Sequence, residues 1–389
     1  MVNKKNIAVI TSTRAEYGLL RSVIKNIDHS EILNLSLIVT GTHLSEKFGN
    51  TVTEIEKDGF NITKKIDILK FENDNLSITK TIAYTIEQFG YYFNKNKFDA
   101  CLVLGDRYEI FAISVAASMQ DIPLIHISGG DVTLGAKDDY FRHSITKMAK
   151  LHFPSCEEYR NRVIQLGEEP KTVYNVGGLG DENIRKIKLL SLDQLSLKFN
   201  YNFTKPYALV TFHPETLANK DVEQQFNELL LALDNFKDIN FIFTKANADA
   251  GGEKINKLID TYVNNNPKNI AFVSMGVINY LSAMKYAKIV IGNSSSGVVE
   301  TPTFKIPTVN IGNRQKGRII CDNIINCICD EKQITSAINN ALSSEFIQKA
   351  KKTISPYNGG DTAKKIVDII EEKLSKNEFK NIKGFYDIK

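Results

Sequence analysis

The residues best suited to chemistry in this 389-residue chain are aspartates in its first half. Asp106 and Asp131 each come just after an apolar run, and Asp138 opens the helical pattern that follows. In an open parallel sheet, ligands bind at the edge where the carboxyl ends of the strands meet. Crowding of carboxylates raises the pKa of at least one of them, so such a cluster can supply both an acid and a base. The three aspartates therefore predict acid–base chemistry.

The helical pattern that begins at Asp138 also offers ion pairs within one helix. Asp138 and Arg142, and likewise Asp139 and His143, are four residues apart, which places each pair on the same helix face. We expect both pairs to form. Such pairs stabilise a helix whether or not its residues are catalytic, so they indicate structure as much as chemistry.

A loop of small and hydroxyl-bearing residues in the second half is suited to binding phosphate. The β-branched run 289–291 stops at Gly292-Asn293-Ser294-Ser295-Ser296-Gly297, and a helical pattern resumes there. A helix N-terminus offers unpaired N–H groups and the positive end of the helix dipole. We expect the two glycines to let a ligand approach the backbone. The loop matches neither GxxxxGK[ST] nor GxGxxG, and a serine-rich turn with an ordinary cap is the alternative.

Charged and imidazole side chains follow other predicted strands. His213 and Arg314 each come directly after an apolar run, and Glu300 lies in the helix after the serine loop, where it can accept hydrogen bonds from ribose hydroxyls. A strand-end histidine is also common as a purely structural residue. Arg14 lies in the first turn of a helical pattern, where a cation opposes the dipole. It therefore fits a ligand contact, with a surface salt bridge as the alternative.

The elements that must hold these residues form a repeated α/β pattern. The apolar runs are continuous, which is typical of strands covered on both faces in a parallel sheet. Helical stretches such as 110–119, 222–236 and 278–287 separate them. The predicted fold class is α/β with two doubly wound, Rossmann-like sheets. The predicted strands are 7–10, 35–39, 100–104, 123–127, 151–153, 173–176, 208–212, 240–243, 270–273, 289–291 and 308–311, and 324–329 is strand-like.

Chain length predicts two domains, because single cores stop growing near roughly 250–300 residues. The polar stretch 186–205 is the expected connection. We expect an N-terminal domain at 1–185 that carries the acid–base residues and a C-terminal domain at 186–361 that binds the phosphate. The final amphipathic helix within 362–389 either packs back on the first domain or closes the second.

Composition excludes several other classes of protein. Lys and Arg total 49 against 45 for Asp and Glu, a net charge of +4 that is too balanced for a dedicated nucleic-acid binder. No apolar run reaches the ~18 residues that a membrane span requires. Five cysteines without CxxC pairs argue against a disulfide framework and a zinc site. We expect a cytoplasmic protein without nucleic-acid or membrane partners.

Seven segments occur in order between about residues 6 and 320 and are specific as a set. They are Thr13-Arg14-Ala15-Glu16-Tyr17, Thr40-Gly41-Thr42-His43-Leu44, Gly105-Asp106-Arg107-Tyr108-Glu109, Arg142-His143-Ser144-Ile145-Thr146-Lys147-Met148, His213-Pro214-Glu215-Thr216, Gly292–Gly297 and Arg314-Gln315-Lys316-Gly317-Arg318. Together they closely resemble the hydrolysing UDP-N-acetylglucosamine 2-epimerases of bacterial sialic-acid and related nonulosonic-acid synthesis.

The resemblance implies a glycosyltransferase-B type fold, with the UDP-sugar in the cleft between two Rossmann-like domains. It implies conversion of UDP-GlcNAc to N-acetylmannosamine and UDP, without metal, NAD or other cofactor, by a dimer or tetramer. UDP leaves by anti elimination, which forms 2-acetamidoglucal, and water is then added with protonation of C2 from the other face. By matching position, Asp106 and Asp138 are acid–base residues, His213 is the active-site histidine and Arg107 is a substrate contact. The positions that align with nucleotide contacts are Asn247, Ser294, Ser295, Glu300 and Arg314.

One position departs from the family pattern. Many relatives carry a catalytic glutamate two residues after the histidine that is His126 here, and this chain has Ser128. A serine is a poor base, so Asp131 either takes that role or only supports it. This position therefore does not decide which residue donates the proton, and it is consistent with a substrate whose sugar is modified.

Four other functions compete with hydrolytic epimerisation of UDP-GlcNAc. The nearest is hydrolysis of UDP-N,N'-diacetylbacillosamine in legionaminic-acid synthesis, which uses the same UDP site. A non-hydrolysing epimerase, a retaining glycosyltransferase and a non-catalytic UDP-sugar-binding protein follow. The last would lack acid–base groups, and the presence of Asp106, Asp131, Asp138 and His213 argues against it. The sugar, the oligomeric state and feedback regulation are not determined by these motifs.

Overall fold

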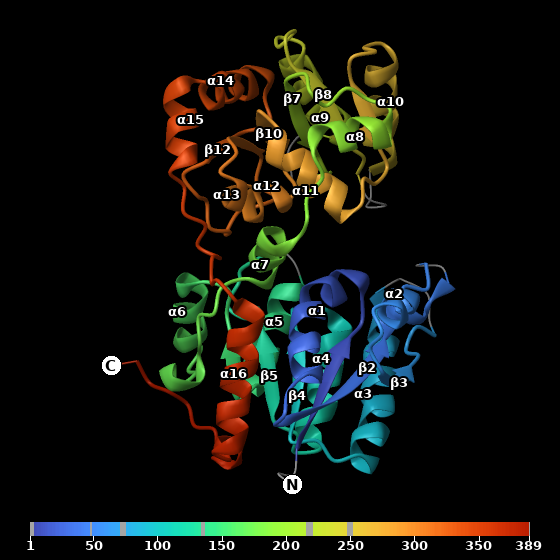
Figure 1. The fold of residues 1–389 in the computed structure, drawn as a ribbon, viewed down its shortest axis with the longest axis vertical. Coiled ribbons are helices and arrows are strands. Elements are labelled where there is room, and N and C mark those ends of the chain that lie inside the picture. Colours follow the sequence, from blue (N-terminus) through green and yellow to red (C-terminus); the bar gives the residue numbers. More distant parts are fainter. Residues whose placement is uncertain are drawn as a thin grey trace. The chain divides into compact units, whose positions relative to one another are not determined.

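The computed structural model describes residues 4–46, 49–70, 75–133, 137–214, 221–246 and 252–388. The chain divides into two compact units, which are coloured along the sequence in Figure 1. Unit 1 comprises Met1–Asn183 and Pro356–Lys389, and unit 2 comprises Ile184–Ser355. Each unit holds a six-stranded parallel sheet with helices on both faces. This is the α/β fold of two doubly wound sheets that the sequence predicts.

In unit 1 the strand order is β3-β2-β1-β4-β5-β6. The residues of β1 alternate between two cores, since Ile7 and Val9 pack on one face of the sheet and Ala8 and Ile10 on the other. This explains the continuous apolar runs. The elements are β1 Lys5–Thr11, α1 Arg14–Asp28, β2 Leu33–Thr40, η1 Gly41–Leu44, α2 Val52–Lys57, β3 Ile62–Ile66, α3 Asn75–Lys95, β4 Ala100–Leu104, α4 Tyr108–Met119, β5 Leu124–Ile127, α5 Asp138–Met148, β6 Leu151–Phe153, α6 Glu157–Gln165, η3 Pro170–Thr172, α16 Thr362–Ser375 and η4 Glu378–Lys380. Helix α7, Leu179–Lys186, begins in unit 1, and its residues from Ile184 onward belong to unit 2.

In unit 2 the order is β12-β11-β10-β7-β8-β9. Here too, Ile289 and Ile291 of β10 enter one core and Val290 enters the other. The elements are α8 Leu192–Phe199, β7 Tyr207–Thr211, α9 Val222–Leu233, β8 Asn240–Thr244, α10 Gly252–Asn264, β9 Ile270–Phe272, α11 Val277–Tyr286, β10 Ile289–Gly292, α12 Ser296–Val299, α13 Thr301–Phe304, β11 Thr308–Ile311, β12 Ile324–Cys327, α14 Glu331–Ala341 and α15 Ser344–Lys351.

Two details of the sheet in unit 1 differ from the sequence-based prediction. Strand β3 was not predicted, because it lies at the sheet edge and its sequence Ile-Thr-Lys-Lys-Ile has no continuous apolar run. Conversely, residues 173–176 were predicted to form a strand, and the structure describes them without one. Val173 makes only an isolated bridge to His152. Val173 and Val176 are buried, and the Tyr174 N–H donates to the His152 carbonyl at 2.9 Å.

The last helix, α16, packs in unit 1. Its buried side chains share a core with β1. Its first turn is held by Glu182, which accepts a hydrogen bond from the Ala363 N–H at 2.7 Å. The chain returns to unit 1 at Pro356, before the predicted domain end at residue 361. There the Tyr357 carbonyl accepts a hydrogen bond from the Gly178 N–H at 2.8 Å. The α16 residues in that core are Ala363, Ile366, Val367, Ile370 and Leu374.

Beyond α16, the C-terminal segment contacts α5 through Lys383. Its Nζ donates to the Lys147 carbonyl at 2.7 Å, at the C-terminal end of α5, and pairs with Glu168 at 2.7 Å. Although burial opposes ionisation of Glu168, hydrogen bonds from His152, Lys147 and Lys383 hold its pKa at about 2. The segment thus stabilises α5 at the end opposite Asp138.

Two expectations from composition concern membranes and thiols. Across the described ranges, no helix combines the length and apolar character needed to cross a bilayer. All five cysteines are free. Burial raises the pKa of Cys156 and Cys321 to about 11, which keeps these thiols protonated at neutral pH.

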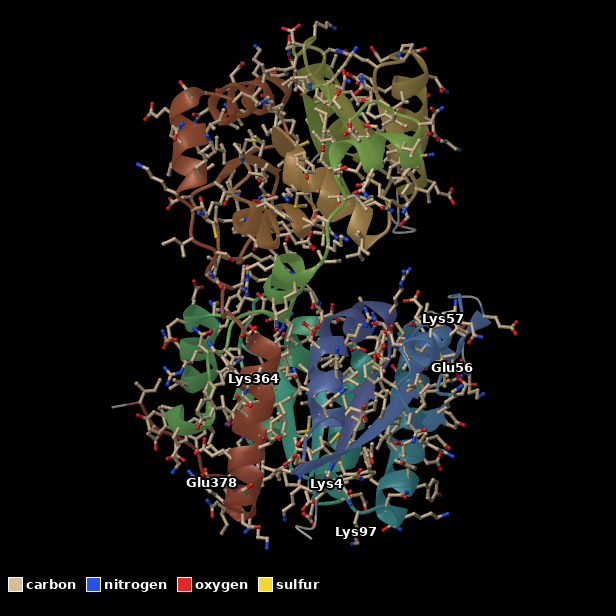
Figure 2. The ribbon with its side chains drawn as sticks, viewed as in Figure 1. Lys4, Glu56, Lys57, Lys97, Lys364 and Glu378 are labelled. Carbon is tan, nitrogen blue, oxygen red and sulfur yellow. The ribbon has the colours of Figure 1, made fainter. Side chains whose placement is uncertain are left out.

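Replacing Lys383 should destabilise unit 1. We expect Lys383→Ala to lower the free energy of unfolding by about 2 kcal/mol, since a buried carboxylate loses one of its cations and α5 loses its cap. Lys364→Ala is the control, because Lys364 near the start of α16 makes an ion pair with Asp368 that is open to solvent (Figure 2). Urea denaturation that gave equal midpoints for both variants would contradict this.

Candidate active site

Two aspartate side chains of unit 1 and the main chain of a third aspartate are gathered by one buried cation, Arg142 of α5. Its side chain is 4% exposed. Its Nε donates to Asp106 Oδ2 at 2.8 Å and its Nη1 to Asp139 Oδ1 at 3.0 Å. Nη1 also donates to the carbonyl of Asp131 at 2.8 Å, and Nη2 to Thr133 Oγ1 at 3.0 Å. A buried guanidinium requires such partners, so Arg142 brings together the segments that follow β4 and β5.

The expected pair between Asp138 and Arg142 does not form. The guanidinium is occupied by Asp106 and by Asp139, which lies three residues before it on α5. The expected contact of Asp139 with His143 is present at 3.5 Å. Among the described residues, Asp138 has no ion-pair partner.

Asp138 is therefore in a different electrostatic state from the aspartates that Arg142 holds. Partial burial and the neighbouring Asp106 raise the pKa of Asp138, and Arg107 and Arg142 oppose this only in part. A raised pKa favours the protonated form of Asp138, whereas the Asp106 carboxylate is held by the Arg142 guanidinium. The two carboxyl groups of this cluster therefore have different surroundings.

His126 positions the loop that carries Asp106. Its Nε2 donates to the Gly105 carbonyl at 2.9 Å, and its Nδ1 accepts from Thr146 Oγ1 of α5 at 3.1 Å. Burial lowers its pKa to about 3, so the ring is neutral. Gly105 has φ +81°, a conformation that favours glycine. His126 thus ties the Asp106 loop to α5 and is no acid–base group at neutral pH.

Ser128 and Asp131 lie in the turn after β5. Ser128 has φ +67°, which is strained for a residue with a side chain and costs on the order of 1–3 kcal/mol. Asp131 Oδ1 accepts from the Val132 N–H at 2.8 Å. Asp131 thus lies in the Arg142 cluster through its main chain, and its carboxylate is the acidic group available in this turn.

The two arginines predicted to bind substrate differ in setting. Arg14 is 66% exposed and pairs with Glu54 at 3.1 Å, so the salt bridge considered as the alternative is present. Arg107 donates from Nε to Glu109 Oε1 at 2.5 Å. The role of Glu109 was missed, although Glu109 ends one of the family-like segments, because only the fold shows its contact with Arg107.

In unit 2 the central residue is Asn293, which was also missed. Its Oδ1 accepts from the His213 N–H at 2.7 Å, and its Nδ2 donates to the His213 carbonyl at 2.8 Å. Its own carbonyl accepts from Arg314 Nη1 at 3.2 Å and from Gln315 Nε2 at 2.9 Å. This buried amide joins the ends of β7, β10 and β11. Its signal in the sequence was the amide between Gly292 and the serines.

The serine loop is built differently from the prediction. Instead of one long helix, α12 and α13 are two short turns, so the dipole at Ser294 and Ser295 is weaker than expected. Gly292, with φ +137°, is required by β7, since a Cβ there would lie 1.9 Å from the Thr211 carbonyl oxygen. Gly297 faces side chains of β10 and β11. Packing against β7 thus accounts for Gly292, and the expectation that these glycines admit a ligand stays a prediction.

Glu300 lies behind the serine loop with a protonatable carboxyl group. Burial raises its pKa to about 7, and its Oε2 is buried with no hydrogen-bond partner. The neighbouring Tyr280 donates to or accepts from Ser296 Oγ at 2.6 Å. An oxygen of this kind can accept a hydrogen bond from a hydroxyl-bearing ligand.

Other features concern the same edge of unit 2. Val273, Val277 and Ile278 expose apolar surface around the start of α11, and sequence reasoning missed them. Asn247 lies outside the described residues. Within the described ranges, no group of three or more His, Cys, Asp or Glu residues could hold a metal ion.

The fold and the strand-end sites define a two-domain α/β protein of the glycosyltransferase-B type. A chain from Neisseria meningitidis, solved as UDP-GlcNAc 2-epimerase bound to UDP-GlcNAc, superimposes with a TM-score of 0.79 at 17% identity, covering 94% of this chain and 100% of that one. The family profile described as UDP-N-acetylglucosamine 2-epimerase matches residues 25–371. The chain belongs to this family of enzymes.

Two curated relatives are similar over most of their length. The polysialic acid biosynthesis protein P7 of Escherichia coli is 42% identical over 385 residues, 99% of this chain and 98% of that protein. The GDP/UDP-N,N'-diacetylbacillosamine 2-epimerase (hydrolyzing) of Campylobacter jejuni subsp. jejuni is 42% identical over 348 residues, 89% of this chain and 90% of that protein.

Removing the Asn293 amide should loosen the edge of unit 2. We expect Asn293→Ala to lower the free energy of unfolding by about 2 kcal/mol, because two hydrogen bonds to the His213 main chain are lost in a buried place. Asn265→Ala, at an exposed amide near the end of α10, is the control. Urea denaturation measures both, and equal stabilities would contradict the central role of Asn293.

Glu300 should make stability depend on pH. The pKa of Glu300 is about 7 in the folded chain and about 4.5 when exposed. The folded state therefore binds the proton more tightly than the unfolded state, and the stability that this provides is lost as the pH rises from 4.5 to 7. Glu300→Gln should gain stability relative to wild type over that range, by at most about 3 kcal/mol. Urea denaturation at both ends of the range tests this, and a pH-independent difference would contradict it.

Proposed function

We propose that the protein is a hydrolysing 2-epimerase that converts UDP-GlcNAc to N-acetylmannosamine and UDP. The observation that carries the proposal is the carboxylate cluster around Arg142, in which a cation holds Asp106 while Asp138 has a raised pKa. Removal of the weakly acidic C2 proton and later reprotonation of C2 need one group of each kind. A protein that only bound UDP-sugars would need neither.

The first step is elimination. Asp106 takes the proton from C2, the C1–O bond breaks, and its electrons leave on the diphosphate of UDP, which gives 2-acetamidoglucal. Water then adds its hydroxyl to C1 while Asp138 delivers its proton to C2 from the opposite face. The proton left by the water restores Asp138, and Asp106 releases the proton taken from C2 to solvent. Asp131 supplies the carboxylate that relatives place at the position of Ser128. Arg107 contacts the sugar part of the substrate.

Unit 2 binds the UDP part. Arg314, with Ser294, Ser295 and His213 of the same unit, stabilises the charge that develops on the departing diphosphate. Arg14 of unit 1 is proposed as a further contact of the substrate. Glu300 accepts hydrogen bonds from the ribose hydroxyls, which suits its unpartnered oxygen. The exposed apolar surface of Val273, Val277 and Ile278 suits contact with the uracil ring, and Asn247 completes the nucleotide contacts.

The second candidate substrate is UDP-N,N'-diacetylbacillosamine. The likeness to the Campylobacter jejuni enzyme named for that sugar favours it. The elimination and hydration steps would be unchanged, since the two sugars differ at C4 and C6 and the bonds that break lie at C1 and C2.

The acid–base assignment predicts a split between turnover and binding. Asp106→Asn and Asp138→Asn should each lower kcat by about 10²–10⁴-fold while UDP affinity changes only a few-fold. Arg314→Ala should weaken UDP binding by about 2 kcal/mol or more. Kinetics and calorimetric titration with UDP measure both, and near-normal turnover of Asp106→Asn would overturn the assignment.

The choice of substrate is tested by proton NMR in D2O with each UDP-sugar. Release of UDP and of a free 2-epimerised sugar deuterated at C2 from UDP-GlcNAc is the expected result. Turnover of UDP-N,N'-diacetylbacillosamine alone would keep the mechanism and replace the substrate. Tight binding of UDP without turnover of either would overturn the proposed function. Comparison of Asp131→Asn with Ser128→Ala then shows which of the two residues takes part in proton transfer.

A further inference from the structure

Two buried glutamates that the proposed reaction does not use meet at the carboxyl ends of β1 and β4. Glu16 is 5% exposed and Glu109 is 2% exposed. The Ser12 hydroxyl lies between them, 2.6 Å from Glu16 Oε2 and 3.2 Å from Glu109 Oε1. The other oxygen of each carboxyl, Glu16 Oε1 and Glu109 Oε2, is buried without a hydrogen-bond partner.

The hydrogen bonds of this group cannot all be made if both glutamates are ionised. A serine hydroxyl has one proton to donate, and an ionised carboxylate can only accept. Glu16 Oε2 already accepts from the main-chain N–H of Ser12 at 2.7 Å and of Thr13 at 3.1 Å, and Glu109 Oε1 accepts from Arg107 at 2.5 Å. One additional proton lets the Ser12 hydroxyl donate to one carboxyl and accept from the other.

A count of charges leads to the same result. Among the described residues Arg107 is the cation paired with these glutamates, so two ionised glutamates would leave one buried negative charge without a cation of its own. Burial and the neighbouring Glu109 raise the pKa of Glu16 to about 7, against the opposing hydrogen bond from Ser12.

We propose that Glu16 and Glu109 hold one proton between them through Ser12, and that the remaining single negative charge fixes Arg107 in the orientation that contacts the substrate. Both glutamates are positioning residues, because they act through Arg107. The effect on turnover rests on the proposed function, whereas the shared proton does not.

The groups that face this pair determine what loss of the proton does. Arg107 and Tyr108 come from the start of α4, and Asp138 of α5 interacts electrostatically with Glu109. On the other side, Gly41 of η1 contacts the Ser12 carbonyl, and the nearby His43 is neutral, because burial lowers its pKa to about 4. A second negative charge would therefore bind Arg107 more tightly to the pair and raise the pKa of Asp138 further.

The shared proton is tested first by infrared spectroscopy, without substrate. Protonated carboxyl groups absorb separately from carboxylates, so the difference spectrum between wild type and Glu16→Gln near neutral pH isolates this pair. We expect a protonated carboxyl band that Glu16→Gln removes. Glu109→Gln should move the titration of Glu16 to lower pH, because a neighbouring negative charge is lost. A carboxylate band in the difference spectrum at about pH 6 would overturn the shared proton.

The link to Arg107 is tested by the pH profile of kcat/KM. Glutamine mimics the protonated glutamate, so the ratio of Glu16→Gln to wild-type kcat/KM should rise roughly three- to tenfold between about pH 7 and pH 9. The control is Glu56→Gln, since Glu56 on α2 pairs with Lys65 at the surface (Figure 2). Its ratio to wild type should stay constant.

The outcomes separate the two proposals. If infrared spectroscopy shows the shared proton but the ratio of Glu16→Gln to wild-type kcat/KM does not change with pH, the link to Arg107 is overturned. Lack of turnover with either UDP-sugar would overturn the proposed function, while the infrared result would still decide whether the pair holds a proton. Normal folding of each variant is checked by its circular dichroism spectrum.

Discussion

The arrangement of unit 1 depends on the burial of one guanidinium group. Arg142 lies almost entirely out of water, and an unpaired charge there would cost several kcal/mol. Its partners come from the loop after β4, the turn after β5 and the first turn of α5. Because a guanidinium has a rigid planar fork of donors, it fixes the directions of these partners as well as their distances. The carboxylate cluster is a consequence of that requirement.

In unit 2 the buried polar group that holds the strand ends together is neutral. The Asn293 amide uses both its donor and its acceptor on the main chain of His213, and its carbonyl holds Arg314 and Gln315. A neutral amide can be buried at lower cost than a charge, provided its hydrogen bonds are made. The two units thus differ in the polar group that each buries at its strand ends, a guanidinium in unit 1 and a neutral amide in unit 2.

Much of the fold could be predicted because strands covered on both faces leave continuous apolar runs. The prediction failed where that reason does not apply. Strand β3 has a solvent-exposed edge with two lysines, and segment 173–176 is apolar but makes only one bridge to β6, which is too little for a strand. At the site, Asp106, Asp131 and Asp138 were predicted to lie together from their places after strands. The roles assigned to them, and to the nucleotide contacts, stay predictions.

The sequence alone determined which segments become buried strands and which polar residues follow them, because these depend on local hydrophobicity and on the common edge of a parallel sheet. It also carried the motifs of the epimerase family. Only the tertiary structure decided the partners. Arg142 binds Asp106 and not Asp138, Gly292 is required by Thr211, and Ser12 meets Glu109 across 97 positions of sequence. Hydrogen bonds need distances within tenths of an ångström, and packing between elements, not spacing along the chain, sets those distances.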